Sequence, residues 1–357
     1  MNLGSKTLPL PILQGGMGIG VSLDGLAGEV ARCGGMGTIS AALCGFHEPD
    51  FDLDPKGASL RALKKQILRA KEWAAGCGLV AVNVMVATAQ YRECVCAALG
   101  AGADAIVCGA GLPVELPQLA REMGNTDTLL APVVSSGRAA AALCRLWQRH
   151  GRLPDFLVLE GPLAGGHLGF AADEAELAQK GGGKTLEELL GEVLKAIAPY
   201  EKEKKIPVFV AGGIEDGGQM ARLMQLGAAG AQFATRFITT KECDASDGYK
   251  QALLGCKTED IAIVQSPVGM PGRALRSPLI RRVEEGKQPK AERCMRCITP
   301  CRPDKAPYCI SRALIAAEQG DWENGLFFCG ANAGRKKAIT TVRAEMDRIM
   351  DEWRKAQ

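Results

Sequence analysis

The sequence predicts an α/β protein: a (β/α)8 TIM barrel followed by a small helical extension that is rich in cysteine. Short apolar runs alternate with helical patterns from the N-terminus to about residue 240, and this alternation is typical of a parallel sheet. Eight apolar runs can be counted, and that number favours a closed barrel over an open sheet. The length agrees, because such a barrel takes about 250 residues.

The expected strands and helices follow one another in regular order. The run 79–86 is too uniformly apolar to have a solvated face, as expected for a strand buried on both sides. The eight strands are expected at 10–14, 36–42, 79–86, 105–108, 129–134, 156–160, 207–211 and 229–234. Helices are expected between them at 24–33, 60–75, 90–99, 114–122, 138–148, 186–198 and 217–226. The eighth helix is expected from the residues after Phe237.

The character of the sequence changes after Phe237. Proline and charge are scattered over 241–293, and four cysteines are concentrated in 294–309. We therefore expect a barrel over 1–240 and a C-terminal extension over 241–357. The helices of the extension are expected at 311–319 and 336–354.

The composition excludes several classes of partner. A net charge of +3 gives no reason to expect nucleic acid or an anionic membrane. No apolar run approaches the roughly 20 residues that span a bilayer, and the first nine residues lack the pattern of a signal peptide. Without such a signal, the 14 cysteines are expected to be reduced thiols, which predicts a cytoplasmic protein. A small-molecule substrate is expected, and a homo-oligomer is compatible with the sequence.

The active site is expected at the C-terminal ends of the strands, as in other TIM barrels. Phosphate sites in this fold are commonly built from the loops after strands seven and eight. Gly212 and Gly213 follow the seventh strand and leave bare backbone N–H groups, because glycine lacks the Cβ that would keep a phosphate away. Ala234 and Thr235 end the eighth strand. The alternative interpretation of these two loops is a pair of tight turns.

A third loop carries a candidate acid–base residue. It runs from Glu160 to His167 and contains too much glycine to be a packed element. A histidine on such a loop at the catalytic face is suited to act as a proton donor or carbonyl clamp, since its unperturbed pKa lies near neutrality. Of the two other histidines, His47 lies in the long second loop, and an approach to the pocket is the less favoured interpretation of it, whereas His150 is expected to serve as a charge at a helix C-terminus.

These features together resemble the family of nitronate monooxygenases (2-nitropropane dioxygenases) and type II enoyl-ACP reductases, over roughly residues 8 to 280. The motifs that carry the resemblance are PILQGGM at 11–17, NVM at 83–85, AGGHLG at 164–169, AGGI at 211–214 and GAQFATRF at 230–237. The resemblance implies an FMN-binding TIM barrel in which His167 is the catalytic histidine.

The same resemblance implies the residues that bind FMN. The flavin ring and ribityl chain are expected along Gly15, Gly16, Met17, Asn83 and Gly109. The phosphate is expected at Gly212, Gly213, Ala234 and Thr235. Three further residues are expected to bind the cofactor: Gln14, Gly165 and Gly166.

The two branches of this family differ in chemistry. Nitronate oxidation needs a base or an anion clamp and access for O₂. Enoyl reduction passes a hydride from NAD(P)H through the flavin to a C=C bond and needs an acid to supply a proton. The glutamate at position 160, at the start of the glycine loop, resembles the residue type of the reductase branch, because the oxidising branch tends to carry Gln at this position. Glu160 and His167 are therefore the expected catalytic pair.

Four cysteines in the tail depart from the family pattern. Cys294, Cys297, Cys301 and Cys309 have the spacing C-x₂-C-x₃-C-x₇-C. Thiolates at such spacing can bind one metal centre. The first three cysteines, spaced C-x₂-C-x₃-C and followed by a later cysteine, are similar to the cluster-binding stretch of the iron–sulfur old yellow enzymes. Structural zinc sites more often use two C-x₂-C knuckles. The spacing predicts a [4Fe-4S] cluster, with zinc or no metal as the alternatives.

These observations predict an FMN-dependent oxidoreductase that reduces an activated C=C bond, in an enone or an enoyl thioester, with NAD(P)H as electron donor. The main alternative is oxidation of alkyl nitronates by O₂, which a cluster would suit poorly. The second alternative is an FMN and iron–sulfur electron-transfer subunit that serves a redox partner protein.

Overall fold

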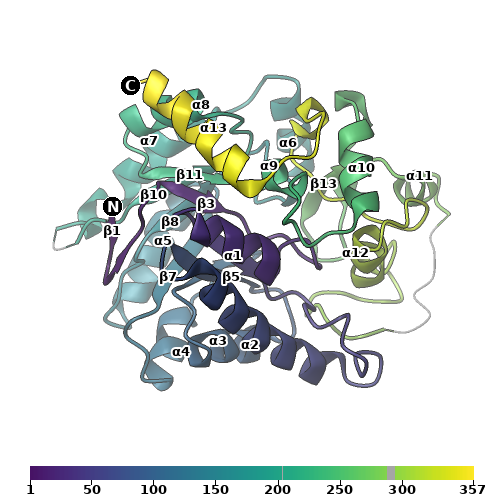
Figure 1. Ribbon diagram of the computed structural model, residues 1–357, viewed down its shortest axis with the longest axis horizontal. Coiled ribbons are helices and arrows are strands. Elements are labelled where there is room, and N and C mark those ends of the chain that lie inside the picture. The colour runs from purple at the N-terminus through teal and green to yellow at the C-terminus, as the bar shows by residue number, and fades with distance from the viewer. Residues whose placement is uncertain (203, 288–293) are drawn as a thin grey trace.

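A closed barrel of eight parallel strands forms the centre of the molecule, so the predicted fold is confirmed. The computed structural model describes residues 1–202, 204–287 and 294–357. Hydrogen bonding connects the barrel strands in the order β10-β11-β3-β4-β5-β6-β7-β8 (Figure 1). Their bounds are β3 (Ile12–Gln14), β4 (Met36–Ser40), β5 (Leu79–Met85), β6 (Ala105–Gly109), β7 (Leu129–Val134), β8 (Leu157–Glu160), β10 (Val208–Ala211) and β11 (Gly230–Phe233).

Helices surround the barrel at the positions that the sequence pattern predicts. Their apolar faces pack on the outside of the strands in one large core. The seven that follow the first seven barrel strands are α1 (Asp24–Arg32), α2 (Pro55–Ala74), α3 (Tyr91–Gly100), α4 (Leu116–Glu122), α5 (Gly137–Gln148), α7 (Leu186–Ile197) and α8 (Gly217–Gln225). Within the described residues 1–202, 204–287 and 294–357, none of the helices combines the length and the apolar character that a membrane span requires.

The eighth barrel helix is supplied by the C-terminus of the chain. Helix α9 (Thr235–Ile238), which follows the last barrel strand, has only 4 residues and cannot cover it. Instead α13 (Val342–Lys355) packs between α8 and α1 (Figure 1). The contact is close, because a Cβ on Gly217 would lie 1.9 Å from the Ile349 carbonyl oxygen. The eighth helix therefore comes from the residues after Phe237, as predicted, but from more than 100 positions further along the chain.

The barrel interior is filled by apolar side chains and closed at one end. Phe156 and Phe209 meet edge to face inside it, with ring centroids 5.6 Å apart. The short hairpin of β1 (Asn2–Leu3) and β2 (Lys6–Thr7) adds Leu3 and Leu8 to this cluster. The N-terminal end of the barrel is therefore plugged, which leaves the C-terminal end for a ligand.

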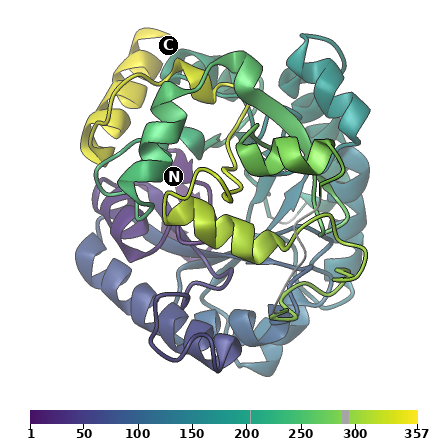
Figure 2. The same ribbon diagram turned by 90° about the vertical axis from the view of Figure 1, so that its right-hand side faces the viewer.

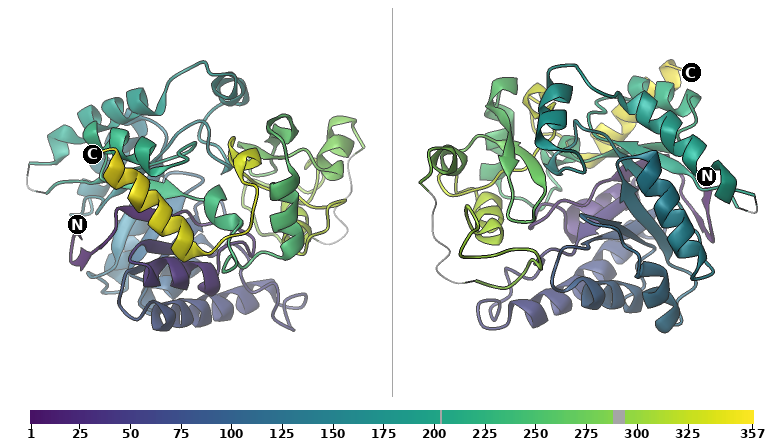
Figure 3. Two further views of the ribbon diagram at one scale, coloured as in Figure 1. Left: turned by 45° about the horizontal axis from the view of Figure 1, so that its top comes forward. Right: turned by 180° about the vertical axis from the view of Figure 1, so that it is seen from behind.

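The rest of the chain lies over that open end. Figure 2 shows these segments in front of the barrel, and Figure 3 shows the same layer from two further sides. It contains α6 (Ala172–Gln179), α10 (Asp247–Gly255), α11 (Pro278–Glu284), α12 (Ile310–Glu318), the hairpin of β12 (Ile261–Gln265) and β13 (Pro271–Leu275), and the 3-10 turns η2 (Thr258–Asp260) and η3 (Ala333–Arg335). A further 3-10 turn, η1 (Ala198–Tyr200), connects α7 to β10. Strand β13 also pairs with β9 (Gly166–His167), a contact that the strand pattern of the sequence did not predict.

Candidate active site

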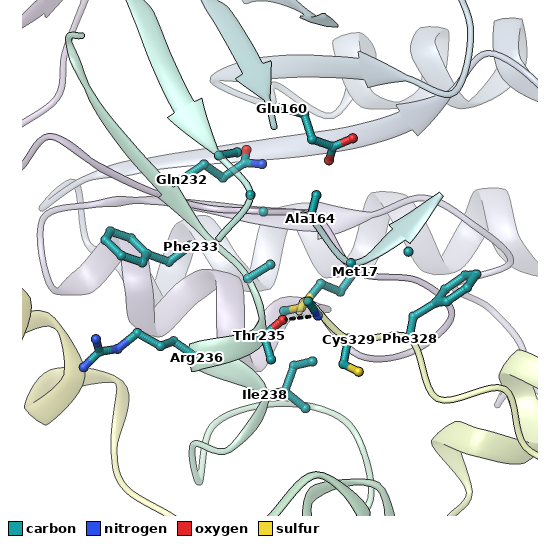
Figure 4. Close-up of a pocket in the computed structure, with 18 of the residues that line it drawn as sticks. Met17, Glu160, Ala164, Gln232, Phe233, Thr235, Arg236, Ile238, Phe328 and Cys329 are labelled. Atoms are coloured by element: carbon teal, nitrogen blue, oxygen red, sulfur yellow. Dashed lines mark hydrogen bonds between the residues drawn. The ribbon is translucent and has the colours of Figure 1, made fainter. Parts of the chain in front are cut away.

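A cavity of about 420 Å³ opens at the C-terminal ends of the barrel strands. That volume lies in the range of sites for small molecules and cofactors. The structure brings nearly all the predicted site residues together in its wall: Gly15, Gly16, Met17, Asn83, Gly109, Glu160, Gly165, Gly166, His167, Gly212, Gly213, Ala234 and Thr235. Figure 4 shows Glu160 and Gln232 on one side of the pocket and Thr235, Cys329 and Phe328 on another.

One predicted residue, Gln14, and the less favoured candidate His47 lie elsewhere. Gln14, at the end of β3, is fully buried and does not line the cavity. Its side-chain oxygen accepts the Thr38 N–H at 2.8 Å, and its amide donates to the Gly15 carbonyl, so the side chain is used to hold the strand ends. His47 is also outside the cavity, because its exposed ring faces Glu318 with an Nε2–Oε1 distance of 3.6 Å.

The loop after β10 has the conformation of a phosphate cradle. Gly212 and Gly213 both have a φ of +91°, a left-handed conformation that side chains rarely adopt. A Cβ on Gly212 would lie 2.7 Å from the Gly161 carbonyl oxygen, and one on Gly213 would lie 2.8 Å from the Leu163 Cβ. Both positions therefore require glycine, and the bare backbone faces the same cavity as Thr235. This geometry fits an anionic group such as the phosphate of FMN.

A segment of the C-terminal tail closes one wall of the cavity, and no pattern in the sequence predicted this contact. We call residues 327–332 the tail strap. The Gly330 N–H donates to Thr235 Oγ1 at 2.9 Å, and the Ala331 N–H donates to the Leu163 carbonyl at 3.1 Å. Asn332 Nδ2 donates to the Gly213 carbonyl at 3.0 Å. The strap therefore touches both the phosphate cradle and the glycine loop.

The strap and the glycine loop are in direct backbone contact. A Cβ on Gly165 would lie 2.3 Å from the Cys329 carbonyl carbon and 2.5 Å from the Gly330 nitrogen. No side chain can occupy that space unless the backbone moves. The signal available in the sequence was the Cys329-Gly330 pair, but one glycine in an aperiodic stretch does not identify its partner.

His167 lies on β9 with its ring held from two sides. Its Nε2 is 2.8 Å from the Ser266 hydroxyl, and the ring meets Phe328 edge to face at 5.1 Å. Burial lowers the pKa of His167 to about 4. The imidazole is therefore neutral near pH 7, with one N–H to donate.

Glu160 ends β8 and also lines the cavity. Burial raises the pKa of its carboxyl to about 8, while the nearby Arg273 guanidinium acts in the opposite direction. Near pH 7 most of this carboxyl is therefore the neutral acid. Two titratable groups whose pKa values are shifted in opposite directions are typical of an acid–base site.

The four tail cysteines are not assembled as the predicted metal site. All are free thiols, and no group of three or more metal-ligating side chains in the described residues is placed to hold an ion. The Cys297 thiol lies 2.9 Å from the Ser311 hydroxyl, and the Cys294 sulfur accepts the Arg296 N–H at 3.3 Å. Local hydrogen bonds therefore take up two of the thiols.

Comparison with known proteins supports an oxidoreductase. The family model described as nitronate monooxygenase matches residues 3–352, so the likeness reaches into the tail. A probable nitronate monooxygenase of Staphylococcus saprophyticus is 32% identical over 131 residues, 37% of this chain and 34% of that protein. A Mycobacterium tuberculosis protein named (3aS,4S,5R,7aS)-5-hydroxy-7a-methyl-1-oxo-octahydro-1H-indene-4-carboxyl-CoA dehydrogenase is 33% identical over 134 residues, 38% of this chain and 33% of that protein. These matches thus span about a third of the length of either relative.

A solved structure covers far more of the chain. The structure of FabK from Thermotoga maritima has a TM-score of 0.72 and 26% identity, and the match covers 98% of this chain and 94% of that one. The extension after the barrel therefore has a counterpart in that structure.

Proposed function

Because this chain belongs to the nitronate monooxygenase family of flavin-dependent oxidoreductases, we propose that FMN occupies the cavity and that the enzyme reduces an activated C=C bond in an enone or enoyl thioester. The phosphate would be held by the backbone of Gly212 and Gly213 with Thr235. The ring would lie along Gly16, Asn83 and other residues of the first strand ends. When bound, FMN supplies hydride transfer.

The protein residues would act on the substrate rather than on the cofactor. The neutral His167 has an N–H to donate to the carbonyl oxygen of the enone or thioester, which withdraws electrons from the C=C bond. Glu160, held as the neutral acid, would supply the proton that completes the reduction. In balance, one hydride from NAD(P)H and one proton saturate the C=C bond and leave NAD(P)⁺.

The single observation that carries this proposal is the position of the Glu160 carboxyl in the cavity wall, where burial raises its pKa to about 8. Reduction consumes a proton, so an acid that keeps its proton near pH 7 suits it. A nitronate is an anion, and a neutral acid with a neutral imidazole offers it no positive charge. The relative that is named as a carboxyl-CoA dehydrogenase further supports a thioester substrate.

The second candidate is nitronate oxidation, which the name of the Staphylococcus relative favours. One experiment separates the two. The enzyme is loaded with FMN and reduced without oxygen, and the flavin absorbance is followed after an enone, an enoyl thioester or a nitronate is added. Reoxidation by an enone or thioester supports reduction. No reoxidation by either, together with O₂ consumption on alkyl nitronates, contradicts it.

We also propose that the tail cysteines bind a [4Fe-4S] cluster, with zinc as the alternative. Support comes from their spacing in the sequence, C-x₂-C-x₃-C-x₇-C. The thiols would have to approach one another more closely than they do here. Iron, sulfide and zinc analysis of protein purified without oxygen tests this directly, and a metal-free protein would contradict it. An electron-transfer role would also require a stable partner chain.

A further inference from the structure

One buried cation stands out beside the proposed site. Arg273 lies on β13, and its side chain is fully inaccessible to solvent. Burial lowers the pKa of its guanidinium to about 10, so the group is still charged near pH 7. A charge in such a place costs several kcal/mol unless hydrogen bonds compensate it. Arg273 therefore needs hydrogen-bond partners to remain charged in this place.

The guanidinium donates hydrogen bonds to backbone and amide oxygens that precede and follow His167 in the sequence. Before His167, it donates to the Pro162 carbonyl at 2.9 Å and to the Ala164 carbonyl. After His167, it donates to the Ala175 carbonyl and to Gln179 Oε1, both at 3.1 Å. The planar guanidinium has five N–H donors and can make these four bonds at once, whereas the lysine ammonium has only three donors on one nitrogen.

The backbone of the same residue holds the loop as well. Arg273 pairs with Gly166, and its neighbour Gly272 pairs with His167, in the β13–β9 ladder. The Arg273 carbonyl accepts the Cys329 N–H at 3.3 Å, which adds the tail strap. One residue of β13 thus joins the glycine loop, α6 and the tail strap.

We propose that Arg273 is a positioning residue, which clamps the loop from Pro162 to Gln179 so that His167 is held at the substrate carbonyl. It does not line the cavity, so it contacts no reacting atom and acts through the loop, beside its electrostatic effect on the Glu160 carboxyl. The proposal rests on the proposed function for the role of His167, but the clamp itself is a property of the loop and can be measured without turnover.

The test compares Arg273→Met and Arg273→Lys with Arg276→Lys. Arg276 is a matched control, because it follows Arg273 by three positions but is half exposed and paired with Glu284. Hydrogen–deuterium exchange is measured on residues 161–170 of FMN-loaded protein. The kinetic constants kcat and KM are measured with the enone or enoyl thioester that reoxidises the reduced enzyme. A misplacement of about 1 Å costs on the order of 10²-fold in rate.

The expected result is faster exchange in residues 161–170 for both Arg273 variants. We expect kcat to fall about 10²-fold in Arg273→Met and less in Arg273→Lys, with KM nearly unchanged. Arg276→Lys should match the wild type. If Arg273→Met does not fold, Arg273→Lys decides alone. Folded, FMN-loaded variants with wild-type exchange and kcat would overturn the proposal. If exchange is faster in the Arg273 variants but the wild type reduces no enone or enoyl thioester, the positioning role of Arg273 still holds and the proposed reaction is rejected.

Discussion

Gly165→Ala tests whether the tail strap closes the cofactor cavity. The added Cβ would lie 2.3–2.6 Å from three backbone atoms of Cys329 and Gly330, so the strap must move. The φ of Gly165 is not in the left-handed region, and therefore the substitution adds a clash without backbone strain. Overpacking of this kind costs about 1–3 kcal/mol.

The clash should appear in FMN affinity, because the strap also bonds to Thr235 at the phosphate end. At about 1.4 kcal/mol per tenfold change, the Kd for FMN should rise about 5- to 140-fold. The assay is a titration of apoprotein with FMN, followed by flavin fluorescence. Gly191→Ala is the control, since Gly191 lies within α7 with no heavy atom within 4 Å of its added Cβ. It should leave Kd unchanged and stabilise the protein by about 0.5–1 kcal/mol. If Gly165→Ala binds FMN as tightly as the wild type, the strap is not part of the cofactor wall.

The remaining predictions concern the acid–base pair and the strap. His167→Ala should lower turnover on the order of 10²–10⁴-fold while FMN stays bound, and full turnover would reject its assignment. Activity should fall as pH rises through about 8, where Glu160 ionises, and Glu160→Gln should lower kcat and abolish this decline in a pH–rate profile. In the apoprotein, the raised pKa of Glu160 contributes stability that is fully present below about pH 4.5, the ordinary pKa of the carboxyl, and is lost as the pH rises to about 8. The urea midpoint of unfolding should therefore fall across this pH range in the wild type and stay more nearly constant in Glu160→Gln. Thr235→Val leaves the Gly330 N–H without its acceptor, at a cost of about 1–3 kcal/mol, and a weaker FMN Kd is expected; an unchanged Kd would contradict the bond's importance.

Local pattern was sufficient to predict the barrel and the position of most of the site. Each barrel strand is a short apolar run, and parallel strands place their C-terminal ends on one face. The glycine loops at Gly165 and at Gly212, and His167 between them, could therefore be assigned to one pocket without knowledge of distances. The family motifs then supplied the expected cofactor. The same reasoning placed Gln14 in the pocket, but its side chain bonds to the backbone of Thr38 and Gly15 and does not line the cavity.

The sequence by itself thus determined the barrel, the face that carries the site and the candidates Glu160 and His167. Only the tertiary structure decided what surrounds them: the tail strap against Gly165, α13 in the place of the eighth helix, and β13 beside β9 with Arg273 beneath the loop. The physical reason is sequence separation. Strand and helix periods report contacts between near neighbours, whereas these contacts join segments about 100 residues or more apart in the sequence. Burial also decided the protonation of Glu160 and His167, since a pKa depends on the environment that the whole fold creates.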